Sequence, residues 1–158
     1  MTKITVFHNV ARECRYCSER VVEDNDGIWH SATGNYCADS PDAYLHLGGL
    51  ASFGGYKAGQ PLVPVFTVDW NGGAAGPHVL AEMMFSIGNA PAEYLTGSSQ
   101  TVAAAYRERK LRSLSVGDVV QIGEVFMACQ SVGFTEVEQP ANILTEWHET
   151  TCTVLLPV

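Results

Sequence analysis

The sequence predicts an α+β fold, a mainly antiparallel sheet with two helices, plus a small zinc-ribbon-like insertion. Three observations predict it: β-rich segments at both ends of the chain, two central segments with helical periodicity, and a cluster of cysteines near the start. The chain has 158 residues, 46% of them hydrophobic and 16% charged, which suits one globular domain with a small satellite. We assign residues 1–10 and 51–158 to the α+β domain and residues 11–50 to the insertion.

The first strand is expected over residues 3–9, where polar and apolar side chains alternate and Val6 and His8 share one face. Residues 61–69 form the next candidate strand of the domain, after a glycine-rich stretch. Because proline cannot donate to a central ladder, Pro64 places this strand at an edge or at a bulge.

Two helices are expected in the middle of the chain. Apolar side chains recur at helical spacing over residues 77–88, with a proline at the start and a glycine that closes the helix. A second helix starts near Ser98 or Ser99, either of which can cap it, and runs to Lys110. Tyr106 lies on its buried stripe, and its basic end suits the negative pole of the helix dipole.

Further strands are expected towards the end of the chain. Residues 119–129 form two short β-rich runs split by Gly123 and Glu124, the glycine-first pattern of a tight two-residue hairpin. Residues 134–137 and 150–156 supply the remaining strands.

The cysteines near the start predict a zinc site. Cys14 and Cys17 form a C-x2-C pair, and Cys37 follows a β-prone segment whose hairpin would bring a second ligand pair to the first. Zn²⁺ takes four tetrahedral ligands, and His46 is the expected fourth, with His30, a carboxylate or water as alternatives. The insertion has few apolar residues, so this structural Zn²⁺ would hold it together.

The charges bear on the partner. The chain has 17 acidic and 9 basic residues, a net charge of -8, and no Lys or Arg from residue 21 to 56 or from residue 118 to 158. Such acidic segments either simply solvate the surface, or dock a basic protein patch, or imitate the charge of a nucleic acid. The net charge disfavours nucleic-acid binding. The alternative is a nucleic-acid-linked regulator whose phosphate-contacting strip comprises Arg12, Arg15, Arg20, Arg107, Arg109, Lys110 and Arg112.

Catalytic patterns are weak. The chain has no G-x-S-x-G element, and its spacing assembles no Cys-His-Asp set. Asp118 follows a glycine, which is typical of a turn residue that bonds nearby backbone amides, and Cys129 in a β-rich run is expected to be a small core residue. We therefore expect a non-enzymatic binding protein, with a small hydrolase or nuclease as a further alternative.

The location follows from hydropathy. No apolar run approaches about 18 residues and the first residues turn polar early, so neither a membrane span nor a signal peptide is expected. We therefore expect a cytoplasmic protein. In such a reducing compartment, thiols clustered at short spacing indicate metal ligands before disulfides.

Two pieces of the chain resemble known families. The C-x2-C segment with Trp29 is similar to short zinc-ribbon-like segments of small actinobacterial and actinophage proteins of unassigned function. Residues 112–120, Arg-Ser-Leu-Ser-Val-Gly-Asp-Val-Val, resemble the corresponding block of YodL-like domains. The piece to which this block belongs also includes residues 4–10, 55–62 and 85–89, and it looks like a family of small accessory proteins from the same sources. Together the two pieces cover most of residues 3–137. The resemblance implies an accessory protein of a phage or mobile element that binds a host protein, and it implies no reaction.

Overall fold

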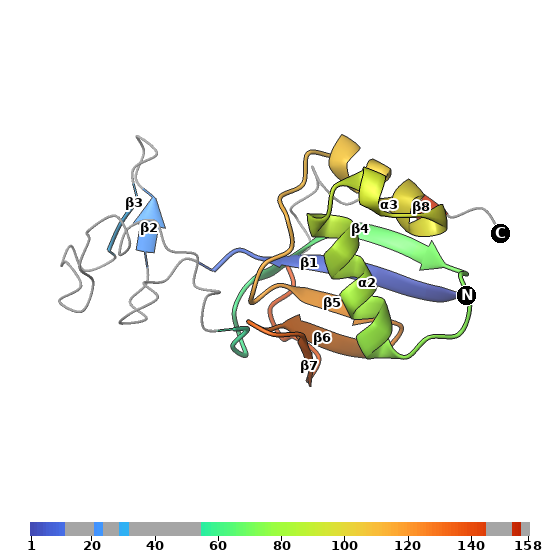
Figure 1. Cartoon of the computed structure of the whole chain (residues 1–158). Coiled ribbons are helices and arrows are strands. Elements are labelled where there is room, and N and C mark those ends of the chain that lie inside the picture. Colours follow the sequence, from blue (N-terminus) through green and yellow to red (C-terminus); the bar gives the residue numbers. More distant parts are fainter. Residues whose placement is uncertain (12–20, 24–28, 32–54, 145–152, 156–158) are drawn as a thin grey trace.

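The computed structural model describes residues 1–11, 21–23, 29–31, 55–144 and 153–155 and shows an α+β architecture (Figure 1). One sheet has the strand order β7-β6-β5-β1-β4-β8. Its strands are β1 (Thr2–Asn9), β4 (Leu62–Trp70), β5 (Val119–Ile122), β6 (Val125–Cys129), β7 (Phe134–Val137) and β8 (Thr153–Leu155). Between β4 and β5 the chain forms α2 (Pro77–Asn89), the 3-10 helix η2 (Ala92–Tyr94) and α3 (Gly97–Glu108).

The predicted antiparallel sheet is confirmed for the strands from β7 to β4, whose pairings are all antiparallel. β8 differs, because it pairs with β4 in parallel. The reason lies in the chain path after β7. Residues 142–144 cross to the start of β4, where Leu62 donates its N–H to Asn142 O and accepts from the Leu144 N–H. Residues 142–144 thus lie beside the first residue of β4 and run parallel to that strand, as β8 does.

A bulge interrupts the pairing of β1 with β4. Val6 pairs with Phe66 and Phe7 pairs with Pro64, which leaves Val65 as the extra residue on β4. Pro64 therefore lies at a bulge of an interior strand. The sequence predicted that Pro64 lies either on an edge strand or at a bulge, and the structure shows the bulge.

The helices cover one face of the sheet. Figure 1 shows α2 lying across β1, β5 and β6, with α3 beside it. Sheet and helix side chains together form the main core, which includes Ile4, Val6, Phe66, Val120, Met127, Leu80, Met84, Val102 and Tyr106. The opposite face has a smaller cluster of Phe7, Leu62, Val119, Phe126 and Ala128, against which Tyr56 and Ile143 pack. Within the described ranges no helix is long and apolar enough to cross a membrane.

The helix boundaries differ slightly from those expected. α2 ends at Asn89, one residue after Gly88, which is buried against Leu114. α3 begins at Gly97, and the expected capping by Ser98 or Ser99 is wrong, since the N-cap position is Thr96 and no side-chain capping bond forms there. Gly97 has a φ of 58°, so the backbone itself turns into the helix at this glycine.

Lys110 follows α3 with a φ of 55°, the left-handed conformation that glycine adopts without a steric penalty. We expect Lys110→Gly to raise the free energy of unfolding by about 1 kcal/mol, because it relieves the clash of Cβ with the following carbonyl. Urea unfolding followed by circular dichroism measures this change. Glu108→Gly, in the last turn of the right-handed helix, is the matched control and should lower stability by about 1 kcal/mol. A loss of stability in both variants would contradict the prediction.

Candidate functional site

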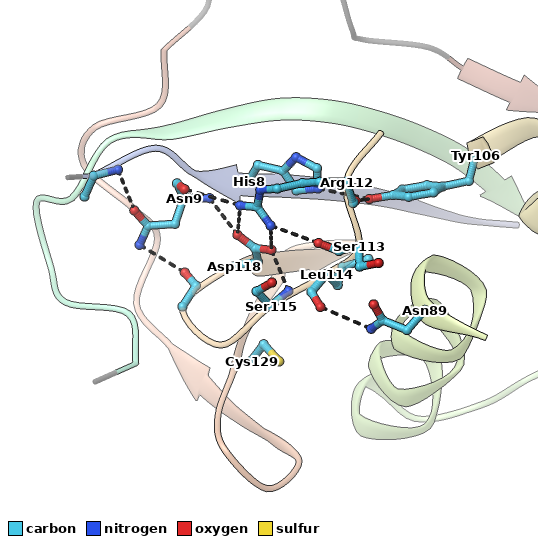
Figure 2. A network of polar contacts seen from close by, with 12 residues as sticks. His8, Asn9, Asn89, Tyr106, Arg112, Ser113, Leu114, Ser115, Asp118 and Cys129 are labelled. Carbon is cyan, nitrogen blue, oxygen red and sulfur yellow. Dashed lines mark hydrogen bonds and ion pairs between the residues drawn. The ribbon is translucent and has the colours of Figure 1, made fainter. Parts of the chain in front are cut away.

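The carboxylate of Asp118 is the centre of a buried polar network (Figure 2). It accepts hydrogen bonds from the backbone N–H groups of Asn9 and Ser115, each at 2.8 Å. The bond to Ser115 is the local turn contact that a glycine-aspartate pair predicts, and it is confirmed. The bond to Asn9 joins the same carboxylate to the end of β1, which no local pattern indicates.

Arg112 donates further hydrogen bonds to the Asp118 carboxylate. Its two terminal nitrogens donate to the two carboxylate oxygens at 2.7 Å, a bidentate pair. The Asp118 side chain is fully buried, whereas the Arg112 side chain is 34% exposed. The Arg112 guanidinium also donates to the carbonyl groups of Asn9 and Ser113. The sequence grouped Arg112 with a phosphate-contacting strip, and the structure instead commits it to a carboxylate inside the protein.

His8 and Tyr106 extend the network to α3. The hydroxyl of Tyr106 donates to the carbonyl of Arg112 at 2.8 Å and lies 2.9 Å from Nε2 of His8. Because the hydroxyl has a single proton, its oxygen must accept from His8, which assigns the proton of the neutral imidazole to Nε2. Burial lowers the pKa of His8 to about 4, and the nearby Asp118 opposes this shift only in part. Burial also raises the pKa of Tyr106.

Asn9 links this network to the base of the predicted insertion. Its side-chain amide donates to Gln60 Oε1 at 2.8 Å and to the carbonyl of Gly117 at 3.1 Å. Its side-chain oxygen accepts from the N–H of Ala11 at 3.0 Å. Gln60 also accepts from the backbone N–H of Lys57 at 2.9 Å. Asn9 therefore holds together three segments: the chain that leaves β1 at Ala11, the turn of residues 57–60 before β4, and the loop before β5.

The arrangement stabilises the fold and does not resemble an acid-base relay. In a hydrolase triad the aspartate orients the histidine, whereas here the Asp118 carboxylate bonds to Arg112 and to two backbone amides. His8 directs Nε2 to Tyr106 and is neutral at physiological pH. The network joins the end of β1, the end of α3 and residues 112–118.

Cys129 lies next to this network, on β6. Its side chain is 2% exposed, which confirms the expected role as a small core residue. Burial, together with Asp118 and Glu82, raises the pKa of its thiol to about 11. The thiol is therefore protonated and unreactive at neutral pH.

The predicted zinc ligands Cys14, Cys17, Cys37 and His46 lie outside the described residues. The alternative ligand His30 lies in β3 (Trp29–Ser31), opposite Val22 of β2 (Val21–Glu23). These two strands form an antiparallel pair, which confirms the pairing of the expected hairpin. In the part of the chain that the structure describes, no group of three or more His, Cys, Asp or Glu side chains could hold a metal ion.

Sequence reasoning missed the joint role of His8, Tyr106 and Arg112. One signal was present, because His8 continues the apolar face of β1 and a histidine on such a face needs a polar partner in the core. The partner itself is 98 residues away in the sequence. No spacing rule identifies a contact at that separation.

The buried His8 makes stability depend on pH. Between its folded pKa of about 4 and the unfolded value of 6.5, the unfolded chain binds a proton that the folded chain excludes. We therefore expect this contribution to be complete above pH 6.5 and to be lost as the pH falls towards 4, by about 3 kcal/mol in total.

The difference in unfolding free energy between the wild type and His8→Gln, measured by urea unfolding at each pH, isolates this contribution. Glutamine can still donate to Tyr106 but does not titrate. His78→Gln, at an exposed position of α2, is the control and should follow the wild-type profile. Identical profiles for the wild type and His8→Gln would show that His8 is not responsible.

Comparisons with protein-family models, with curated proteins and with solved structures give no match to this chain.

Proposed function

We propose that this chain is a non-enzymatic binding protein that docks on a protein partner, as a phage or mobile-element accessory protein that modulates a host protein. The observation that carries the proposal is a set of exposed apolar and acidic side chains on and around β7, an edge strand of the sheet. Phe85, 36% exposed, packs against Phe134 of β7, and Val132, just before the strand, is 90% exposed. The exposed Glu136 lies on β7 and the exposed Glu138 follows it. Apolar side chains beside charged ones are typical of the core and rim of a protein interface.

The buried network supports the non-enzymatic part of the proposal. Asp118, Arg112 and His8 are the residue types that acid-base chemistry would use, and here each makes hydrogen bonds within the fold. Their removal is therefore expected to act through stability. The resemblance of residues 112–120 to YodL-like domains supports the assignment to an accessory protein.

The proposal includes one structural Zn²⁺ bound by Cys14, Cys17, Cys37 and His46, which would stabilise the segment of residues 11–50 as a second contact surface in the cytoplasm. The C-x2-C spacing supports it, because two thiolates of one tight turn can reach the same metal.

The direct test immobilises the purified chain, captures partners from host lysate and repeats the binding with each captured protein in pure form. We expect one protein to bind saturably and to remain bound when the salt concentration is raised to about 150 mM, because an interface with an apolar core depends little on salt. Binding to duplex DNA that is strong at low salt and vanishes at moderate salt would instead favour a phosphate-contacting role. Turnover of a substrate, abolished by one side-chain change, would favour the enzyme alternative.

The nucleic-acid alternative is weakened by what the basic residues contact. Arg112 bonds to Asp118, and Arg107 donates to the carbonyl of Ala103 at 3.1 Å. We expect no measurable binding to duplex DNA at about 150 mM salt, since the basic residues of the strip act against a net charge of -8. Fluorescence anisotropy measures the binding. Submicromolar affinity that the double change Arg109→Ala and Lys110→Ala abolishes would reverse the order of the two functions.

A further inference from the structure

We propose, building on the protein-binding function above, that the outer edge of β7 binds a basic, extended segment of the partner as an added strand. β7 is the last strand of the sheet, on the side away from β4 (Figure 1). On its inner side it pairs with β6 in regular antiparallel register from Phe134 to Val137. In the described structure no strand pairs with its outer side.

The register shows which backbone groups face outward. The N–H of Gln130 donates to the carbonyl of Gly133 at 2.9 Å, which makes these residues a hydrogen-bonded pair. Because such pairs alternate along an antiparallel ladder, Ala128 with Thr135 is the next one. The residue between, Cys129, directs its own N–H and carbonyl to the opposite side, towards Asp118 and Gly117.

It follows that Phe134 and Glu136 present their backbone N–H and carbonyl groups away from β6. These are the groups with which an added strand forms a ladder. Natural edge strands are usually protected by lysine, proline or a bulge. β7 has the sequence Phe-Thr-Glu-Val and pairs with β6 without a register shift, so it has no lysine, proline or bulge. Among the described residues, its four-residue length and the charge of Glu136 are its only protection, and Glu136 repels acidic strands but not basic ones.

The charges at this edge select a basic strand. Glu136 and Glu138 are exposed on and after β7, and the exposed Glu82 of α2 reaches the start of the strand, where a Cβ at Gly133 would lie 3.4 Å from its Oε1. No Lys or Arg occurs between residues 113 and 158 to offset them. A lysine or arginine of an added strand would therefore meet carboxylates, with cross-strand pairing energies that favour opposite charges.

An apolar ledge lies beside the same edge. Phe85 of α2 packs against Phe134 in a T-shaped contact with ring centroids 6.4 Å apart, and it is 36% exposed. Since α2 and the Phe134 side chain lie on the same side of the sheet, this ledge fits an apolar side chain on that face of the added strand. A second copy of this chain is the less favourable occupant, because two β7 strands would bring their glutamates together.

The test uses a fluorescent peptide with lysine and valine in turn at every second position and threonine between them, so that lysine and valine share one face of the strand. The comparison peptide has glutamate in place of each lysine. We expect saturable anisotropy changes with the lysine peptide only, and slower amide exchange at Phe134 and Glu136 when it is bound. Equal binding of both peptides, or protection located elsewhere, would overturn the proposal.

Two variants locate the contact. Glu136→Lys replaces an attractive charge by a repulsive one and should weaken binding of the lysine peptide about tenfold, whereas Glu93→Lys on η2 makes the same charge change elsewhere and should alter it less than twofold. Glu136→Pro removes one outward N–H without touching the ladder to β6 and should abolish binding. If circular dichroism shows that the proline variant is unfolded, Glu136→Lys decides alone, and unchanged binding in that variant overturns the proposal.

Binding of a whole host protein distinguishes the proposed strand contact at β7 from the proposed protein-binding function. A host protein that binds the wild type and Glu136→Lys equally well would leave the protein-binding function in place and refute the contact at β7. Peptide binding at β7 with no protein captured from the host would refute the host-protein function and leave the edge as a strand-binding site.

Discussion

Replacing Asp118 with alanine is expected to lower the free energy of unfolding by about 3 kcal/mol, a large share of the stability of a small domain. The change leaves the backbone N–H groups of Asn9 and Ser115 without their acceptor and leaves Arg112 without its counter-charge. Breaking a buried pair on one side costs more than the pair contributes, because unpaired groups stay away from water. The Arg112 side chain is one-third exposed and can partly rehydrate, which limits the loss.

Urea unfolding followed by circular dichroism measures this loss. Glu124→Ala, in the exposed β5–β6 turn, removes the same charge without a buried partner and should change stability by less than about 0.5 kcal/mol. The double variant of Arg112→Ala with Asp118→Ala should lose less than the sum of the two single variants. Additive losses would show that the ion pair does not couple the two residues.

Substitution of a zinc ligand should have the second large effect. We expect one zinc per chain by elemental analysis, and complete loss of the metal in Cys14→Ser and Cys17→Ser, because a thiolate supplies much of a binding free energy of about 10–16 kcal/mol. Chelation should remove amide-exchange protection from residues 12–46. It should leave α2 protected, since α2 packs in the main core of the α+β domain.

The matched controls are the cysteines outside the predicted site. Cys129→Ala and Cys152→Ala should retain zinc, and Cys129 in particular is buried on β6 in the main domain. His46→Ala and His30→Ala then distinguish the two candidate fourth ligands, since only the true ligand lowers the zinc affinity. Retention of zinc by Cys14→Ser would refute the ligand assignment.

The elements that the sequence predicts correctly are those with a local cause. The alternation in β1 and the glycine of the β5–β6 turn act within a few residues, and both elements form as expected. The proline in β4 likewise identified an irregularity, because a missing N–H has the same effect in any sheet. The parallel pairing of β8 depends on where residues 142–144 lie against Leu62, and no local pattern contains that information.

The polar network around Asp118 likewise contains one local contact that the sequence predicts and long-range contacts that it does not. The turn bond from Ser115 to Asp118 spans three residues and follows from residue type, so it was predictable. The bond from Asn9 to Asp118 joins residues 109 positions apart, and the contact of His8 with Tyr106 joins residues 98 apart. Such contacts exist only once the sheet has formed, which is why Arg112 was grouped by charge with its neighbours in sequence.

The interior position of β1 in the sheet affects the order in which the strands pair and the length of the segment that can lie between β1 and β4. β1 comes first in the sequence, yet it lies between β4 and β5, so its pairing waits until strands far along the chain are available. The β5–β6–β7 meander needs only short turns and can form early. Closing the loop between β1 and β4 costs conformational entropy that grows only with the logarithm of its length, about 0.6 kcal/mol for each doubling. Residues 12–54 therefore occupy a position where evolution can lengthen, shorten or exchange a module at little cost to the domain that carries it.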